Sequence, residues 1–335
     1  VSDTVSVLCV VGTDLYVGGN FAHAGNWDGQ VTVNHIARYN TLDQTWYPLG
    51  VGVNSVVYAI VAWESSVFVG GLFNAAGGAT ARHLAQWVPS TEHWYEVGFG
   101  VGEINYSDVV NDLVISPDGQ YLYAGGSFAT VGGGLTGYGS IARYSLTSFG
   151  WNSLGGGVPN GAILALGVDA TGALYAGGQF SSIGGQSAQS LAKYSGTSWA
   201  AITPSLNPAF GSVIVNDLCV APDNNLMVAG SFSEGDGVTR LDGGEWHPLW
   251  DNNRQGIENG GRALAVRDLG GSNYEVYVGG RFTNAAGRLA NGIARWSTTS
   301  AWFPLGPALN DEVLAVLDKD GKVYLGGHFT EAGSR

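Results

Sequence analysis

Short apolar stretches alternate along almost the whole chain with turns rich in glycine, asparagine and aspartate. Apolar stretches bounded by such turns predict β-strands, and no segment shows a sustained helical period with caps. One short sequence motif, called the phrase below, recurs along the chain. Its first copy, residues 15–21, reads Leu-Tyr-Val-Gly-Gly-Asn-Phe. Its other copies end at Phe73, Phe128, Phe180, Phe232, Phe282 and Phe329, which are spaced 47 to 55 residues apart. A period of this size predicts repeated supersecondary units.

Each unit is predicted to contain four antiparallel strands, which we name A to D. In the first unit they cover residues 5–11, 15–21, 35–39 and 46–50. Four-stranded sheets at this period pack as the blades of a β-propeller. We therefore predict an all-β chain that forms a seven-bladed β-propeller of four-stranded antiparallel blades, as a single domain over residues 1–335. The predicted units cover residues 4–50, 55–98, 108–155, 162–203, 212–249, 262–306 and, in part, 312–335.

The seventh unit is predicted to be only half present. Residues 313–317 form its strand A and residues 323–329 its strand B, and the sequence stops where strand C should begin. A half-blade would expose the unpaired edge of its strand B, and free edges recruit other strands. We expect protein partners, or another copy of the chain, to complete the sheet by strand addition, unless a continuation of the polypeptide does so.

Residues that recur in every unit are interpreted as packing positions. The paired glycines that end strand B are predicted to let the backbone turn sharply where a side chain would clash. The phenylalanine of the phrase and the tryptophan of strand D are predicted to fill the space between blades; these tryptophans are Trp46, Trp94, Trp151, Trp199, Trp246 and Trp302. Strand C carries a recurring cation, at Arg38, Arg143, Lys193 and Arg295. It is interpreted as one inter-blade hydrogen bond or ion pair per unit, and a ring of cations for an anionic ligand is the alternative.

The combined pattern "YVGG-x-F … G … IARY … W-x-PLG" resembles the kelch repeat and, more closely, the delta-60-type propeller repeats. These occur in secreted and surface-anchored microbial proteins, including fungal cortical-marker proteins. The resemblance covers nearly the whole chain. It implies an extracellular propeller with a binding or structural role, and it implies no catalytic residues.

Composition narrows the classes of function. The chain has 335 residues, of which 45% are hydrophobic, enough for a large core, and 12% charged. A net charge of −13 disfavours binding to nucleic acid or to an anionic membrane surface, and no stretch is apolar for long enough to span a membrane. The two cysteines, Cys9 and Cys219, hold the same slot in two units and are predicted to be buried thiols without a disulfide. The single methionine is Met227, so we expect a processed product or a fragment.

No catalytic, cofactor or metal site is predicted, so we expect no enzyme and no cofactor. The six histidines lack zinc-site spacing, and the paired glycines lack the lysine and helix of a phosphate loop. Asn105 begins the one N-glycosylation sequon and could carry a glycan. In the loop of residues 250–261, Trp250, Asp251 and Glu258 could offer a stacking ring and acids to a sugar. The other interpretation is a solvated loop with Trp250 packed beneath it.

The function these observations favour is a non-catalytic extracellular scaffold, located outside the cell or on its surface and acting as an adhesive or filament-forming propeller. A secreted carbohydrate-binding module, with glycans as partners, is the alternative. A secreted propeller enzyme, such as a lyase or oxidase, is the third hypothesis.

Overall fold

The computed structural model describes residues 1–25, 29–103, 107–156, 159–209, 211–249, 256–257, 260–298, 302–305 and 309–333. The chain divides into two compact units. The first comprises Val1–Ile163 with Ile183–Gly185 and Gly196–Ser198, and the second comprises Leu164–Ser182, Gln186–Ser195 and Trp199–Arg335.

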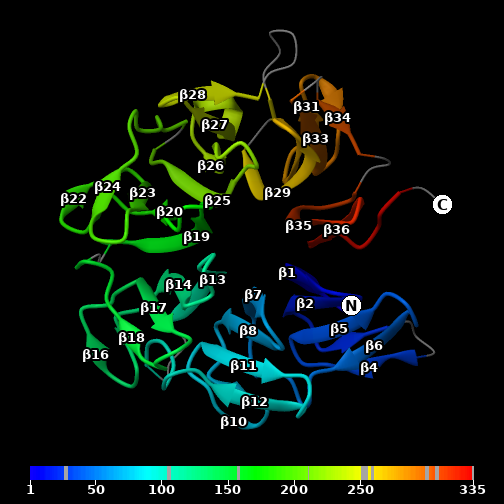
Figure 1. Cartoon of the computed structure of the whole chain (residues 1–335). Coiled ribbons are helices and arrows are strands. Elements are labelled where there is room, and N and C mark those ends of the chain that lie inside the picture. Colours follow the sequence, from blue (N-terminus) through cyan, green and yellow to red (C-terminus); the bar gives the residue numbers. More distant parts are fainter. Residues whose placement is uncertain are drawn as a thin grey trace. The chain divides into compact units, whose positions relative to one another are not determined.

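The first unit holds three four-stranded antiparallel sheets, each built from one repeat (Figure 1). Strands A to D of each sheet follow one another along the chain, so every pairing is between neighbours in the repeat. The first sheet contains β1 (Thr4–Val11), β2 (Asp14–Asn20), β5 (Ile36–Asn40) and β6 (Thr45–Pro48). The second contains β7 (Val57–Trp63), β8 (Ser66–Gly71), β11 (Leu84–Val88) and β12 (His93–Glu96). The third contains β13 (Val109–Ile115), β14 (Tyr121–Ser127), β17 (Ile141–Ser145) and β18 (Trp151–Asn152).

Sheets four to six have the same order, and the second unit holds them except for the first residues of β19. The fourth contains β19 (Ala162–Val168), β20 (Leu174–Gln179), β23 (Leu191–Tyr194) and β24 (Trp199–Ala201). The fifth contains β25 (Ile214–Val220), β26 (Leu226–Ser231), β27 (Val238–Asp242) and β28 (Glu245–Pro248). The sixth contains β29 (Gly261–Gly270), β30 (Asn273–Gly280), β33 (Ile293–Ser297) and β34 (Phe303–Pro304).

The loop between strands B and C is itself structured, which the sequence analysis did not anticipate. Five of these loops fold into two-stranded hairpins, and the fifth blade has the 3-10 helix η2 (Glu234–Gly237) instead. The hairpins pair β3 (His23–Ala24) with β4 (Val31–Thr32), β9 (Ala75–Ala76) with β10 (Ala79–Thr80), β15 (Thr130–Val131) with β16 (Leu135–Thr136), β21 (Ser182–Ile183) with β22 (Gln186–Ser187), and β31 (Asn284–Ala285) with β32 (Arg288–Leu289).

The fold is a β-propeller, and the described residues form six four-stranded blades. The prediction of an all-β propeller is therefore confirmed. The seventh repeat does not form a blade of this kind: its β35 (Val313–Lys319) and β36 (Lys322–Gly327) make a two-stranded sheet.

The paired glycines allow close approach of neighbouring strands; they do not turn the chain. A Cβ atom on Gly18 would lie 2.5 Å from Val57 Cγ1 of the next blade. A Cβ atom on Gly19 would lie 2.2 Å from the carbonyl oxygen of Thr4, beside a β-bulge in β1. Neither glycine has a positive φ, and β2 continues to Asn20. The predicted sharp turn is therefore wrong, whereas the predicted clash of a side chain is confirmed.

The fifth blade shows that the two residues in contact across neighbouring blades, such as Gly18 and Val57, have complementary sizes. Its strand B has Ala229 where the other copies have a glycine, and the facing residue of the next blade is Gly261. In four other blades the facing residue is a valine: Gly18 faces Val57, Gly70 faces Val110, Gly177 faces Val215 and Gly279 faces Val313. The extra methyl group on one strand is thus matched by a missing side chain on the other.

The strand-C cations are structural, but they pair within their own blades, so the predicted inter-blade pairs are wrong. The antiparallel register places Arg38 opposite Tyr16, diagonal to the acid that begins strand B. The pairs are Arg38 Nη1 to Asp14 Oδ2 at 3.1 Å, Lys193 Nζ to Asp169 Oδ2 at 3.3 Å and Arg295 Nη1 to Glu275 Oε1 at 2.7 Å. Arg143 stacks instead on Tyr121, with its Cζ 4.6 Å from the ring centroid.

Both cysteines are free thiols, as predicted, and each is partly buried. Burial raises the pKa of Cys9 to about 11 and raises the pKa of Cys219 as well. Neither thiol is therefore a reactive thiolate at neutral pH.

The fit between blades five and six can be tested by exchanging the two residues. Gly261→Val alone should lower the thermal unfolding midpoint, because even a Cβ atom at position 261 lies 2.8 Å from Ala229 Cβ. Overpacking of this kind costs about 1–3 kcal/mol. Adding Ala229→Gly restores the glycine–valine pair of the other blades and should recover part of the loss. A double variant whose midpoint falls by the sum of the two single losses would contradict this account.

Candidate functional site

The four residues singled out as candidates from the sequence lie outside the described residues. They are the sequon residue Asn105 and the loop residues Trp250, Asp251 and Glu258. Their glycosylation and sugar-binding roles stay predictions. The described residues show a different candidate, which depends on how the blades are joined.

Within each unit, strand-D tryptophans join neighbouring blades. In blade two, Trp94 Nε1 donates a hydrogen bond of 2.7 Å to the carbonyl of Leu49, at the end of strand D in blade one. The same bond, to the carbonyl at or just beyond the end of the preceding strand D, recurs from Trp151 to Gly98, from Trp246 to Pro204 and from Trp302 to Leu249. For these four tryptophans, the predicted packing between blades is confirmed. A complete strand D thus presents a carbonyl acceptor to the next blade.

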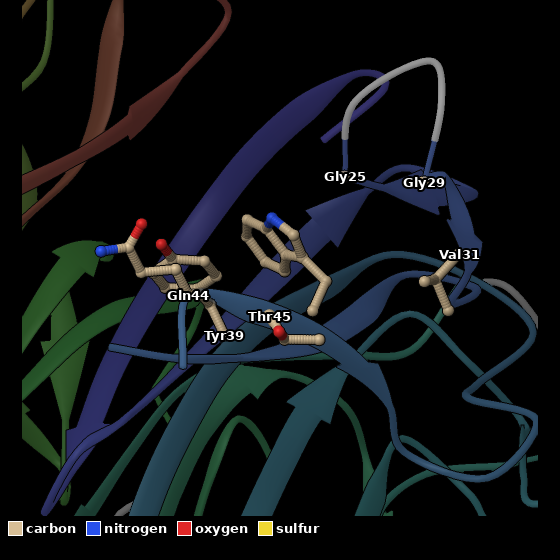
Figure 2. A pocket seen from close by; sticks show the side chains of 7 residues that line it. Gly25, Gly29, Val31, Tyr39, Gln44 and Thr45 are labelled. Carbon is tan, nitrogen blue, oxygen red and sulfur yellow. The ribbon is translucent and has the colours of Figure 1, made fainter. Parts of the chain in front are cut away.

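Trp46 in blade one differs from these four tryptophans. No described residue accepts a hydrogen bond from its N–H, and its ring contacts Tyr39 at a centroid distance of 5.0 Å. Trp46 lines an open pocket of about 730 Å³ together with Gly25, Gly29, Val31, Tyr39, Gln44 and Thr45. Figure 2 shows Tyr39 and Gln44 at one end of this pocket and Val31 at the other, with Gly25 and Gly29 above them. By analogy with the other blades, the pocket is where a carbonyl from a preceding strand D would lie.

In the second unit, the seventh repeat also has backbone N–H groups without described acceptors. They lie at the outer edge of β36. In five blades the N–H of the second glycine donates to the residue before strand C; in blade one, Gly19 donates to the carbonyl of His35 at 3.0 Å. The equivalent Gly327 has no acceptor among the described residues. Outward N–H groups recur at every second residue of a strand, so those of Leu325 and Val323 also face away from β35. The edge of β36 therefore offers three backbone donors in a row.

The side chains of β36 are also less covered than those of a complete blade. Val323, Tyr324 and Leu325 are only half-buried, whereas Leu15, Tyr16 and Val17 are all at most 8% exposed. Strand B of a complete blade is covered on both edges, and this strand is covered on one.

The two-stranded sheet is nevertheless firmly attached to blade six. Arg267 of β29 forms an ion pair with Asp318 of β35, with Nε 2.8 Å from Oδ1, and Arg262 Nε lies 2.9 Å from Glu312 Oε1. The hydrogen bond to Asp318 raises the pKa of Arg267 above its ordinary value. The edge of β36 is therefore held in place before any partner strand arrives.

No group of three histidine, cysteine, aspartate or glutamate side chains comes together for a metal ion anywhere in the described part of the chain. No described helix is long and apolar enough to cross a membrane.

Comparison with known proteins gives a fold and one short sequence match. No protein-family model matches the chain. Among curated proteins, it is 40% identical over 67 residues to the polarized growth protein rax2 of Schizosaccharomyces pombe. That match covers 20% of this chain and 6% of rax2, so this chain is similar to a small part of a much longer protein.

Two solved structures resemble the chain along almost its whole length. YCF48 bound to D1 peptide has a TM-score of 0.57 at 12% identity, covering 98% of this chain and 90% of that one. The computationally designed Ika8 protein has a TM-score of 0.53 at 13% identity, covering 98% and 94%. At these identities the likeness shows the fold alone. The extracellular domain of a one-component system from B. thetaiotaomicron also matches, with a TM-score of 0.47 over 96% of this chain and 38% of that one. This score is too low to support a conclusion about fold or function.

Sequence reasoning found the unpaired edge of β36 but missed Trp46. In the sequence, Trp46 is one of six equivalent tryptophans, and nothing local marks it as different. The difference shows only in the contacts of the folded chain, where Trp94 has the Leu49 carbonyl as an acceptor and Trp46 has none among the described residues.

The two tryptophans can be compared directly by removing only the indole N–H. Trp94→Phe should lower the free energy of unfolding by about 1–3 kcal/mol, because it leaves the Leu49 carbonyl without its donor. Trp46→Phe should cost less, since its N–H has no described acceptor. Thermal unfolding of the two variants tests this, and equal losses would contradict it.

Proposed function

We propose that the protein is a non-catalytic β-propeller scaffold that acts outside the cell or at its surface and associates through the open edge of β36. In this proposal the seventh repeat is the first half of a seventh blade. A two-stranded hairpin, supplied by a partner, by another copy or by further sequence, completes it.

The observation that carries the proposal is the unused donor of Gly327. Strand addition needs a rigid edge with regularly spaced backbone donors and acceptors, and β36 offers one that is anchored by Arg267 and Arg262. Natural proteins usually blunt such edges with charges, bulges or covers. Here Lys322 of β36 and Lys319 of β35 stand at the turn between the two strands, the far end of the sheet from Gly327, and the rest of the β36 edge carries no charged side chain.

The open pocket at Trp46 supports the same kind of partner from an independent place in the molecule. Its missing acceptor is a carbonyl from the end of a strand D. A hairpin of the form strand C, turn, strand D carries one copy of that carbonyl. We therefore expect the partner segment to resemble the second half of this chain's own repeat, which has Ile-Ala-Arg-Tyr in strand C and Trp-x-Pro-Leu-Gly in strand D.

A structural role also accounts for the recurring charged residues. The strand-C cations are engaged with acids or rings of their own blades, which leaves them unsuited to serve as a ring of cations for an anionic ligand. The surface location rests on the repeat resemblance.

The proposal can be tested with a labelled synthetic peptide that copies residues 35–50, the strand C and strand D of blade one. The full chain should bind it saturably, as measured by fluorescence anisotropy. Leu325→Pro removes one outward N–H and leaves the bonds to β35 in place. It should weaken binding at least tenfold, about 1.4 kcal/mol.

Leu325→Val is the matched control, because it changes the side chain and keeps the N–H. It should bind the peptide nearly as well as the wild type. Any concentration-dependent self-association of the wild type, measured by light scattering, should also be lost in Leu325→Pro alone. Peptide binding that is absent in the wild type, or the same in both variants, would overturn the proposal.

A further inference from the structure

A second open groove lies within the first unit, between blades two and three. Its volume is about 590 Å³. Its walls come from the ends of β7 and β12, the β13–β14 turn and the β17–β18 turn. The lining includes five aromatic rings, two amides and three carboxylates: Trp63, Phe68, Tyr95, Tyr144, Phe149, Gln86, Gln120, Glu64, Glu96 and Asp118.

Two of the groove's aromatic residues depart from the pattern of the repeats. Phe149 stands two residues before the strand-D tryptophan, where blades one and two have Gln44 and Glu92. All three have a positive φ, which suits a small or polar residue and not a bulky ring. Phe149 is nevertheless 73% exposed, so no burial of its ring offsets that strain. What distinguishes Phe149 from other exposed rings is that it lines the groove, where a ligand can stack on it.

Trp63 is the other departure. It pairs with Ser66 at the end of strand A, a slot held by Val11 in blade one and Arg267 in blade six. A Cβ atom on Gly119 would lie 1.8 Å from the Trp63 ring, so the indole packs directly against the backbone of the β13–β14 turn. Tyr95, on β12, is 48% exposed at the same groove. The groove thus has a fixed aromatic wall and two exposed rings.

The polar groups of the groove include three carboxylates and two neutral amides, all of which carry acceptor oxygens. Gln86 takes the slot that Arg38 and Arg143 hold in neighbouring blades, so the strand-C cation is replaced by an amide here. Gln86 donates to Ser66 Oγ at 2.8 Å, which leaves its carbonyl oxygen for a ligand. Asp118 accepts from Ser116 through Oδ1 at 2.6 Å, and that bond lowers the pKa of Asp118. Its Oδ2 and the carboxylate of Glu64 have no partner among the described residues.

Exposed rings beside amide and carboxylate acceptors fit the chemistry of a sugar. A pyranose has apolar C–H faces that stack on aromatic rings and hydroxyl donors around its rim. No described residue lining the groove is a lysine or an arginine. Glu96 is paired with Arg82, which lies outside the lining, whereas Glu64 and Asp118 have no cationic partner among the described residues. An acidic sugar would therefore be repelled by these two carboxylates.

We propose that this groove between blades two and three binds a neutral oligosaccharide, with Phe149 and Tyr95 as stacking rings and Gln86 and Asp118 as acceptors for its hydroxyls. The site is distinct from the edge of β36 and from the loop around Trp250. It stands whether or not the proposed strand addition is correct.

Isothermal titration of the full chain with single hexasaccharides tests the site. The neutral probes are β-1,3-linked and β-1,4-linked glucose, β-1,4-linked N-acetylglucosamine and α-linked mannose hexamers, and the acidic probe is hexagalacturonate. At least one neutral hexamer should bind, and hexagalacturonate should bind at least tenfold more weakly than that one. Phe149→Ala should weaken the neutral interaction at least tenfold, as loss of a central stacking ring does.

Phe99→Ala is the matched control, because Phe99 is also a positive-φ phenylalanine of the first unit, 70% exposed, and does not line the groove. It should change the affinity less than twofold. Gln86→Ala, a second variant that removes no aromatic ring, should also weaken binding, and thermal unfolding verifies that each variant is folded. Failure of all four neutral hexamers to bind, preference for hexagalacturonate, or equal effects of the two phenylalanine variants would overturn the proposal.

Discussion

The structure depends on how closely one backbone carbonyl approaches a glycine in the adjacent strand. In five repeats the second glycine of the pair lies against the carbonyl of the residue just before the strand-A bulge, so closely that a Cβ atom would stand within 2.0–2.2 Å of the oxygen. The glycines are Gly19, Gly71, Gly126, Gly230 and Gly327. No side chain other than hydrogen fits there, and no rotamer can relieve a clash between a Cβ and a backbone atom.

Two further contacts join neighbouring blades within each unit. The first glycine of four pairs faces a valine of the next strand A. Four strand-D tryptophans donate to a carbonyl at or just beyond the end of the preceding strand D. A blade makes all of these contacts only when it has a neighbour on both sides. The edge of β36 and the unpaired Trp46 are the places where this requirement is unmet within the described chain, and for that reason they are the candidates for association.

Much of the fold could be predicted from the sequence, because a strand pattern that is ambiguous in one copy becomes clear when it recurs in seven repeats. The Gly-Gly-x-Phe phrase and the strand-D tryptophans give the period, the strand order and the packing side. The direction of the Arg38 pair could not be predicted, because it depends on the register of β2 against β5, which places the acid diagonally within one blade. The short hairpins between strands B and C, with two-residue strands such as β9 and β10, are too short to leave a periodic pattern.

The candidate sites were harder to predict than the fold, for a related reason. The sequence draws attention to irregular loops such as the one around Trp250. The groove between blades two and three is built instead from ordinary repeat positions with unusual occupants, such as Phe149 in a slot that is polar in blades one and two. These unusual residues indicate a binding site only once the fold shows that Trp63, Gln86 and Phe149 line the same groove.

The most direct test of the central contact compares Gly71→Ala with Gly150→Ala. A Cβ at position 71 would lie 2.2 Å from the Val56 carbonyl oxygen, whereas nothing lies within 4 Å of one at position 150, where φ is not positive. The account predicts that Gly71→Ala lowers the free energy of unfolding by about 3 kcal/mol or more, while Gly150→Ala changes it by less than about 1 kcal/mol. Equal thermal unfolding midpoints for the two variants would contradict it.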